Sequence, residues 1–379
     1  MTTHTAIPSQ CHEAANGVSR WIRIALTVVV LFLLGTVRTA FAAGNCQYTT
    51  QSPTWVTLQA SLSGNATVGR DAPIGTVIYT ASYTGGFSTG FALLCTAGRY
   101  QPQTALVSQP YPLSSYVDPS GFPVYQTPIP GIGVRIKHHS NPVPGNEQPI
   151  INPSAPLNSI GTFNFSNFTV ELIKISNVVN AGTISGANLP TFQLSQVSLD
   201  GGNSTRIMLS STVGQVNIIS STCTTPDVTV NLGTHFTTEL KGVGTTTASW
   251  VPVNIQLNNC PAFFGSTYTT FNADTVQTTT GQLAKNSIQY SVNPSNGVAN
   301  ATNGVMNLSS GGASGIGIQL TDISSNPIQF NTATPSGLTL NQTSSANYTI
   351  NLQARYYQTG TSVTAGAANA TATVTLTYL

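Results

Sequence analysis

Charged side chains are the scarcest feature of this sequence. The 379 residues include 12 Lys and Arg and 10 Asp and Glu, which is 6% of the chain. Beyond residue 42 the two signs balance, and no basic cluster stands out. A neutral chain without a basic patch is a poor partner for nucleic acid or an anionic membrane. Its surface must consist largely of Thr, Ser, Asn and Gln, which is typical of an extracellular all-β protein.

The sequence also lacks the 3.6-residue periodicity of long helices. Short apolar or alternating runs, broken by Gly, Pro and Asn, predict strands instead. In the first half these runs are residues 77–79, 134–136, 168–175 and 207–209. In the second half the predicted inward rows are Val228, Val230 and Leu232; Val251, Val253, Ile255 and Leu257; Ile316, Ile318 and Leu320; and Tyr348, Ile350, Leu352, Ala354 and Tyr356. The pattern and the length predict an all-β chain of two β-sandwich domains.

No apolar run is long enough to span a membrane comfortably. The run IALTVVVLFLLG at residues 24–35 follows Arg20 and Arg23, and Ala40-Phe41-Ala42 supplies small residues of the kind that signal peptidase recognises. We therefore expect residues 1–42 to be a signal peptide and the chain to be exported through the periplasm. A retained anchor helix is the alternative.

Cysteine is rare, with five in the chain, and Cys11 lies in the expected signal peptide. An even number of cysteines in an exported protein favours disulfides. Three pairings are possible. We favour Cys46 with Cys95 and Cys223 with Cys260, because more than a hundred residues separate the two pairs. Zinc is the alternative use, but no CxxC or HxxxH spacing accompanies these residues.

Catalytic signatures are missing too. Beyond residue 42 the histidines are His138, His139 and His235, and no G-x-S-x-G elbow is present. Adjacent side chains of an extended segment face opposite ways, which disfavours joint metal binding by His138 and His139. The run GGASGIGIQL at residues 311–320 precedes a predicted strand and carries no Lys, so it does not predict a phosphate site. We expect no enzymatic activity, cofactor or metal.

The last fourteen residues, GAANATATVTLTYL, predict a terminal strand. Its apolar face consists of Ala372, Val374, Leu376 and Tyr378. With Gly366 fourteen residues from the end and a penultimate tyrosine, the segment resembles the carboxyl-terminal signature of chaperone-usher fimbrial subunits. The resemblance implies that these residues form the last strand of an incomplete immunoglobulin-like domain, which a periplasmic chaperone recognises first.

Further motifs extend this resemblance. VTVNLG after Cys223, NIQLNNCP ending at Pro261, GIGIQLTD at residues 315–322 and ARYYQTG at residues 354–360 resemble pilin domains. VGRDAPIGTVI at 68–78, GIGVRI at 131–136 and FTVELIKISNVVNAGTISG at 168–186 resemble the β-sandwich lectin domain of two-domain tip adhesins. We expect a receptor-binding domain at residues 43–219 and a pilin domain at residues 220–379. The family implies that a strand donated by a neighbouring protein completes the latter.

The resemblance implies a fimbrial tip adhesin at the cell surface. If Cys46 is bonded, the start of the chain is tied into the first domain, and we expect no donor strand there. The implied partners are a periplasmic pilus chaperone, an outer-membrane usher, the next fimbrial subunit and a surface glycan. A structural minor pilin or tip adaptor without a ligand is the alternative, and a secreted all-β hydrolase is a third hypothesis.

Residues 100–147 are the richest candidate ligand region, because sugar sites use aromatic faces and carboxylates on loops. The candidate ligand-binding residues are Arg99, Tyr100, Tyr111, Tyr116, Asp118, His138 and Glu147. The mannose-binding type 1 adhesin has an aromatic residue at its mature amino terminus and an Asn-Asp pair just after its second cysteine. Ala43 and Thr96 stand at those positions here, so no mannose-site residue is carried over.

Overall fold

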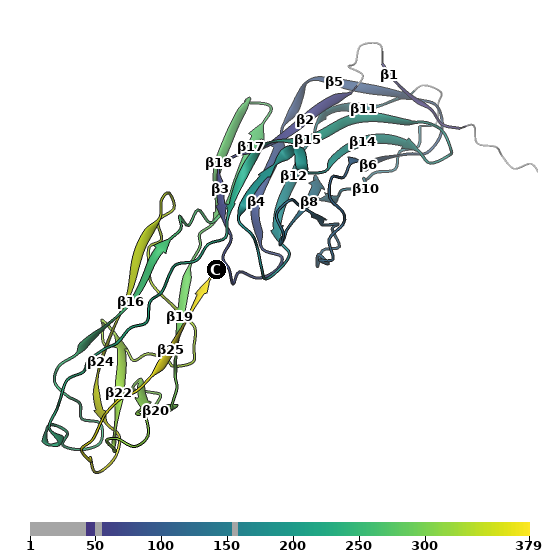
Figure 1. Ribbon diagram of the computed structural model, residues 1–379. Helices are drawn as coiled ribbons and strands as arrows, with labels where there is room; N and C mark the ends of the chain where they lie inside the picture. Colours follow the sequence, from purple (N-terminus) through teal and green to yellow (C-terminus); the bar gives the residue numbers. More distant parts are fainter. Residues whose placement is uncertain (1–42, 50–54, 154–157) are drawn as a thin grey trace, which may run out of the picture.

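The computed structural model describes residues 43–49, 55–153 and 158–379, and it consists of two elongated β domains arranged end to end (Figure 1). The expected signal peptide lies outside the described residues. Helical structure within them is limited to two short 3-10 turns, η1 (Gly186–Asn188) and η2 (Thr237–Glu239). No helix among the described residues is long and apolar enough to cross a membrane. The prediction of an all-β fold is confirmed.

The first domain is built from three sheets around one core. The short sheet has the order β1 (Cys46–Tyr48), β5 (Gly86–Cys95), β11 (Asn158–Phe165). The second has the order β10 (Gly145–Asn146), β6 (Tyr100–Ser108), β14 (Thr191–Ser198), β15 (Ser204–Ile219), β13 (Gly182–Ser185), with β2 (Val56–Leu62) and β3 (Asn65–Thr67) parallel to β15. The third contains β4 (Val77–Thr84), β12 (Phe168–Lys174), β8 (Ile132–His138), β7 (Tyr125–Gln126) and β9 (Asn141–Pro142).

Period-2 alternation explains these strands. In β8, Ile132, Val134 and Ile136 are buried in the core, while Arg135 and Lys137 lie on the other face. The disulfide Cys46–Cys95 joins β1 to β5 at directly opposed positions. The described amino-terminal segment is therefore covalently part of the first domain.

The second domain is a smaller sandwich. One sheet has the order β16 (Val251–Cys260), β24 (Ala346–Gln358), β22 (Ile316–Asp322), β21 (Val305–Asn307), β20 (Val298–Asn300), and the other β23 (Thr334–Pro335), β19 (Ile288–Pro294), β25 (Ala372–Tyr378). Its core includes Ile255, Leu320, Ile350, Leu352 and Tyr378. The disulfide Cys223–Cys260 ties the start of this domain to the end of β16. The predicted terminal strand is β25.

One hairpin crosses between the domains. β17 (Ser266–Asn272) and β18 (Gln277–Ala284) belong by sequence to the second half, yet β17 pairs in parallel with β4 and extends the third sheet of the first domain. The hydroxyl of Thr269, which is buried, lies 2.6 Å from that of Tyr79 and 3.0 Å from that of Ser63. The expected boundary between residues 219 and 220 falls at the end of β15, but structurally the two halves share a sheet.

The expected inward row at Val228, Val230 and Leu232 is not a strand. Among the described residues, the backbone of segment 225–236 has no ladder partner; the one nearby bridge joins Thr224 to Asn258. Val228 is 41% exposed. Alternating apolar residues alone do not form a strand where backbone groups find no neighbour.

Candidate functional sites

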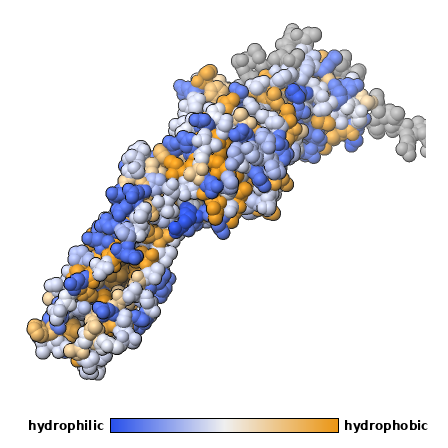
Figure 2. Space-filling view, viewed as in Figure 1, coloured by the Kyte–Doolittle hydropathy of each residue, from blue (hydrophilic) through white to orange (hydrophobic). Residues whose placement is uncertain are grey.

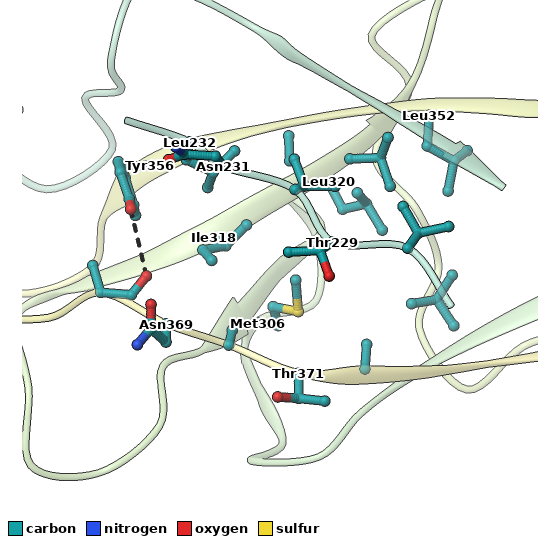
Figure 3. A pocket seen from close by; sticks show the side chains of 18 of the residues that line it. Thr229, Asn231, Leu232, Met306, Ile318, Leu320, Leu352, Tyr356, Asn369 and Thr371 are labelled. Atoms are coloured by element: carbon teal, nitrogen blue, oxygen red, sulfur yellow. Dashed lines mark hydrogen bonds between the residues drawn. The ribbon is translucent and has the colours of Figure 1, made fainter. Parts of the chain in front are cut away.

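The second domain contains a groove of about 1380 Å³. Segment 225–236 forms one wall, and residues 363–376 with Tyr378 form the other. Figure 2 shows apolar surface in a hollow over this domain, and Figure 3 shows Thr229 and Leu232 on one side of the groove and Asn369 and Thr371 on the other. The groove therefore lies between two stretches that would flank a further strand placed in it.

The floor of the groove is apolar. Its side chains come from β16, β19, β21, β22 and β24 and include Met306, Ile318, Leu320, Leu352 and Ala354 (Figure 3). The charged residues that line the groove are Arg70 and Asp227. His235 also lines it, on the same segment as Asp227. Such a surface suits an uncharged, apolar segment, because burying unpaired charge is costly.

β25 presents an open edge to this groove. β19 is its one ladder partner within the described chain, in a register that pairs Ile288 with Tyr378 and Pro294 with Ala372. Upstream of β25, the carbonyl oxygen of Ala368 accepts a hydrogen bond from the Tyr356 hydroxyl at 3.4 Å (Figure 3). Unpaired backbone groups beside an apolar floor are the features of a site for strand addition.

The first domain closes one end of the groove. Asp71 and Tyr378 exchange hydrogen bonds: the Asp71 amide donates to the Tyr378 carbonyl oxygen at 2.9 Å, and the Tyr378 amide donates to Asp71 Oδ2 at 2.8 Å. Arg70 donates to the Leu376 carbonyl oxygen at 2.7 Å. Lys174, which is buried, donates to the carbonyl oxygens of Gly69 and Arg70, and burial lowers its pKa. The loop that contacts β25 is thus anchored to β12.

In the first domain, a proline-rich loop at residues 109–124 carries three of the predicted ligand residues. Tyr111 and Tyr116 are half-buried, and the neighbouring Val117 is 84% exposed. Asp118 is buried, where it accepts from the Ser120 amide and forms an ion pair with Arg135. Asp118 therefore anchors the loop, while Tyr111, Tyr116 and Val117 are accessible to a ligand.

The other predicted residues are spread over the domain. Arg99 is largely exposed and pairs with Asp200 at 2.7 Å, whereas Tyr100 is fully buried and donates its hydroxyl proton to the Thr96 carbonyl oxygen. His138 and Glu147 are both buried and lie together, with Nδ1 2.9 Å from Oε1. Direct contact of these seven residues with a ligand stays a prediction.

Sequence reasoning missed the charged cluster beneath the proline-rich loop. Glu171 forms ion pairs with Arg135 and with Lys137, and the Phe122 ring lies under both cations at 5.7 and 5.5 Å. Three of these residues alternate with apolar ones on β8 and β12, which was a visible signal for a polar face. Their pairing was not visible, because β8 and β12 are far apart in the sequence.

Comparisons with known proteins agree with this architecture. The family profile described as fimbrial protein matches residues 208–379, and the MrkD-like receptor binding domain profile matches residues 61–215. A fimbria adhesin protein of Klebsiella pneumoniae is 26% identical over 323 residues, covering 83% of this chain and 89% of the relative. The fimbrial subunit type 1 of Salmonella typhimurium is 31% identical over 156 residues, covering 40% of this chain and 71% of the relative.

Among solved structures, the CupB6 tip adhesin of Pseudomonas aeruginosa is similar at 18% identity and a TM-score of 0.34, covering 88% of this chain and 94% of that one. The profile matches divide the chain into a receptor-binding type and a pilin type of domain, and the matched relatives are adhesin and pilus proteins. The chain therefore belongs to the fimbrial protein family, as a two-domain adhesin of chaperone-usher fimbriae at the cell surface.

Proposed function

We propose that this protein is the tip adhesin of its fimbrium and that the groove of the second domain receives a donated strand. The groove is the observation that carries the proposal. It combines an apolar floor, two separated walls and the open edge of β25, so an extended segment gains both backbone hydrogen bonds and side-chain burial there.

The same groove serves two partners in turn. A periplasmic chaperone fills it first, which keeps the apolar floor covered during export, and the next fimbrial subunit replaces the chaperone at an outer-membrane usher. Gly366, Ala372, Val374, Leu376 and Tyr378 are the assembly residues. The three residues Val374, Leu376 and Tyr378 are half-buried or buried against the core and position the strand whose edge is offered.

The pairing of the described amino-terminal segment supports the proposed tip position. Cys46 is bonded to Cys95 and lies in β1, which pairs with β5, so residues 46–48 are committed to the first domain. A subunit that accepts a strand and presents a binding domain at its other end suits the end of a fibre. Because the two domains lie end to end (Figure 1), the first domain would then point away from the shaft.

The ligand of the first domain is a surface glycan in this proposal. The proline-rich loop offers half-buried Tyr111 and Tyr116 beside exposed Leu113 and Val117, and ring faces of this kind stack on the apolar faces of sugars. Asp118 and Arg135 hold the loop on the rigid third sheet. The protein acts by binding, without catalysis.

The proposal is tested by export in cells with and without the pilus chaperone, followed by array binding. The chain should co-purify with the chaperone, and Val374→Asp should abolish capture because it places a charge on the apolar face of β25. Thr375→Ser, on the exposed face, is the matched control. Capture of Val374→Asp at the wild-type level would contradict the assembly role. A captured chain that binds no glycan would instead be a minor pilin or adaptor.

A further inference from the structure

Two histidines and a glutamate converge at the edge of the first domain. His138, His139 and Glu147 each offer one ligand atom, and these atoms lie within 4.8 Å of one another. His138 and Glu147 are buried, whereas His139 is exposed. None of the three residues lines the groove of the second domain, so strand addition does not use the cluster.

The two histidines converge because the strand ends between them. β8 ends at His138, and His139 has φ = 52°, which is the left-handed region that non-glycine residues adopt uncommonly. The alternation that sends neighbouring side chains to opposite faces therefore stops at this point. The ring centroids of His138 and His139 are 4.3 Å apart. The sequence argument against joint metal binding assumed an extended backbone and does not hold here.

Neighbouring polar groups orient the cluster. Ser166 Oγ lies 3.0 Å from His138 Nε2, and the Asn141 amide donates to Glu147 Oε2 at 2.5 Å. His138 Nδ1 and Glu147 Oε1 are left facing each other. Partners on the far atoms of ligating histidines and carboxylates are what fixes ligands in metal sites.

The spacing suits a small tetrahedral ion. Bonds of about 2.0–2.1 Å place two ligand atoms of a tetrahedral zinc site about 3.3 Å apart. His138 Nδ1 and Glu147 Oε1 are 2.9 Å apart and would separate by a few tenths of an ångström, while the ligand atom of exposed His139, within 4.8 Å of the others, would move towards them. Two imidazoles and one carboxylate, with a fourth position open to solvent beside His139, form a donor set that Zn²⁺ accepts.

We propose that His138, His139 and Glu147 bind one Zn²⁺ ion that holds together the two ends of the loop between β8 and β10. In this loop, β9 pairs with β8 of the third sheet and β10 pairs with β6 of the second. An ion held by both ends of the loop would fix the place where the two sheets meet. The ion has a structural role here, and the alternative is a hydrogen-bonded His–Glu pair that binds no metal.

The test is zinc titration of the full exported chain, purified without a polyhistidine tag and stripped with a chelator. Calorimetry and elemental analysis should give one Zn²⁺ per chain, and Co²⁺ in its place should give the visible absorption of a tetrahedral site. Because His139 is exposed, His139→Ala should fold normally and bind Zn²⁺ at least about tenfold more weakly. Zn²⁺ should also raise the melting temperature of the wild type and not that of this variant.

His235 provides the matched control. It faces Glu239 at 2.9 Å, which is the same distance as in the His138–Glu147 pair, but no third His, Cys or carboxylate of the described residues joins them. His235→Ala should leave zinc binding unchanged, and Glu147→Gln should weaken it while circular dichroism reports an intact fold. Absence of zinc uptake by the wild type, or equal uptake by His139→Ala, would overturn the proposal.

Discussion

The guanidinium of Arg70 lies over the ring of Tyr378, 5.3 Å from its centroid. These residues belong to different domains, and Arg70 also donates to the Leu376 carbonyl oxygen. Arg70→Ala should cost about 1 kcal/mol, because it removes a half-exposed cation–π contact, the hydrogen bond to Leu376 and a solvent-screened ion pair with Asp71. Hydrogen exchange should become faster in β25. Arg206→Ala, which removes a cation–π contact with Trp55 inside the first domain, should leave exchange in β25 unchanged.

Acid should loosen the same junction. Burial would raise the pKa of Asp71, but hydrogen bonds from Arg70 and from the Tyr378 amide lower it below the ordinary 3.8. Because the pKa of Asp71 is lower in the folded protein than in the unfolded chain, its ionised carboxylate stabilises the fold. This stabilisation is complete above pH 3.8 and is lost as the pH falls through the lower pKa of the folded protein. The melting temperature should therefore fall more steeply below pH 3.8 in the wild type than in Asp71→Asn. Identical acid profiles would show that this carboxylate does not couple the domains.

The crossing hairpin should stabilise the first domain. Thr269→Val removes the hydroxyl that bonds Tyr79 and Ser63, and we expect a loss of about 1–2 kcal/mol in the unfolding of the first domain. Thr280 is paired opposite Thr269 but is exposed, so Thr280→Val is the matched control and should cost little. Equal, small effects in urea unfolding would contradict a supporting role for β17.

Changes to the exposed side chains of the proline-rich loop should weaken ligand binding without lowering stability. Leu113 and Val117 are 57% and 84% exposed, so changing both to Ala should weaken attachment to the ligand without lowering the melting temperature. Val276→Ala, at the exposed tip of the hairpin, is the control. Attachment at the wild-type level by the double variant would remove the loop surface from the ligand site.

Asp118→Ala should act differently, because it removes one of the two carboxylates that pair with Arg135 and leaves Glu171 as the other. We expect a loss of about 2 kcal/mol in stability together with weaker attachment. Equilibrium unfolding of the variant measures the first effect, and a cell-binding assay at equal fibre display measures the second. A stable variant with normal attachment would show that the ion pair does not hold the loop.

Alternation in the sequence was enough to locate β22, β24 and β25, because each has one face in a core. It did not predict β17, whose Thr-rich sequence has no apolar row and whose partner residues, such as Tyr79, lie 190 residues away. Pairing over such distances leaves no local signal. In segment 225–236 alternation indicated a strand that the structure does not form. Alternation shows which side chains are apolar, but it does not show whether the backbone has a neighbouring strand to pair with.

The candidate sites, too, could be predicted only in part from the sequence. The terminal strand was recognisable from Gly366 and Tyr378, but the shape of the groove depends on floor residues from five strands, β16, β19, β21, β22 and β24. The burial of Asp118 and Glu147 could not be foreseen either, because a carboxylate in a loop has the same sequence signature whether it points to solvent or to a buried partner such as Arg135 or His138.

The central claim is that the groove of the second domain accepts a strand. The most direct test is thermal unfolding of the exported chain with and without a donor strand of alternating apolar residues, fused after Leu379 through a short flexible linker. The fused strand should raise the melting temperature of the second domain and the periplasmic yield, because it covers the groove floor and pairs the open edge of β25. A second domain equally stable in both forms would already be complete and would contradict the account.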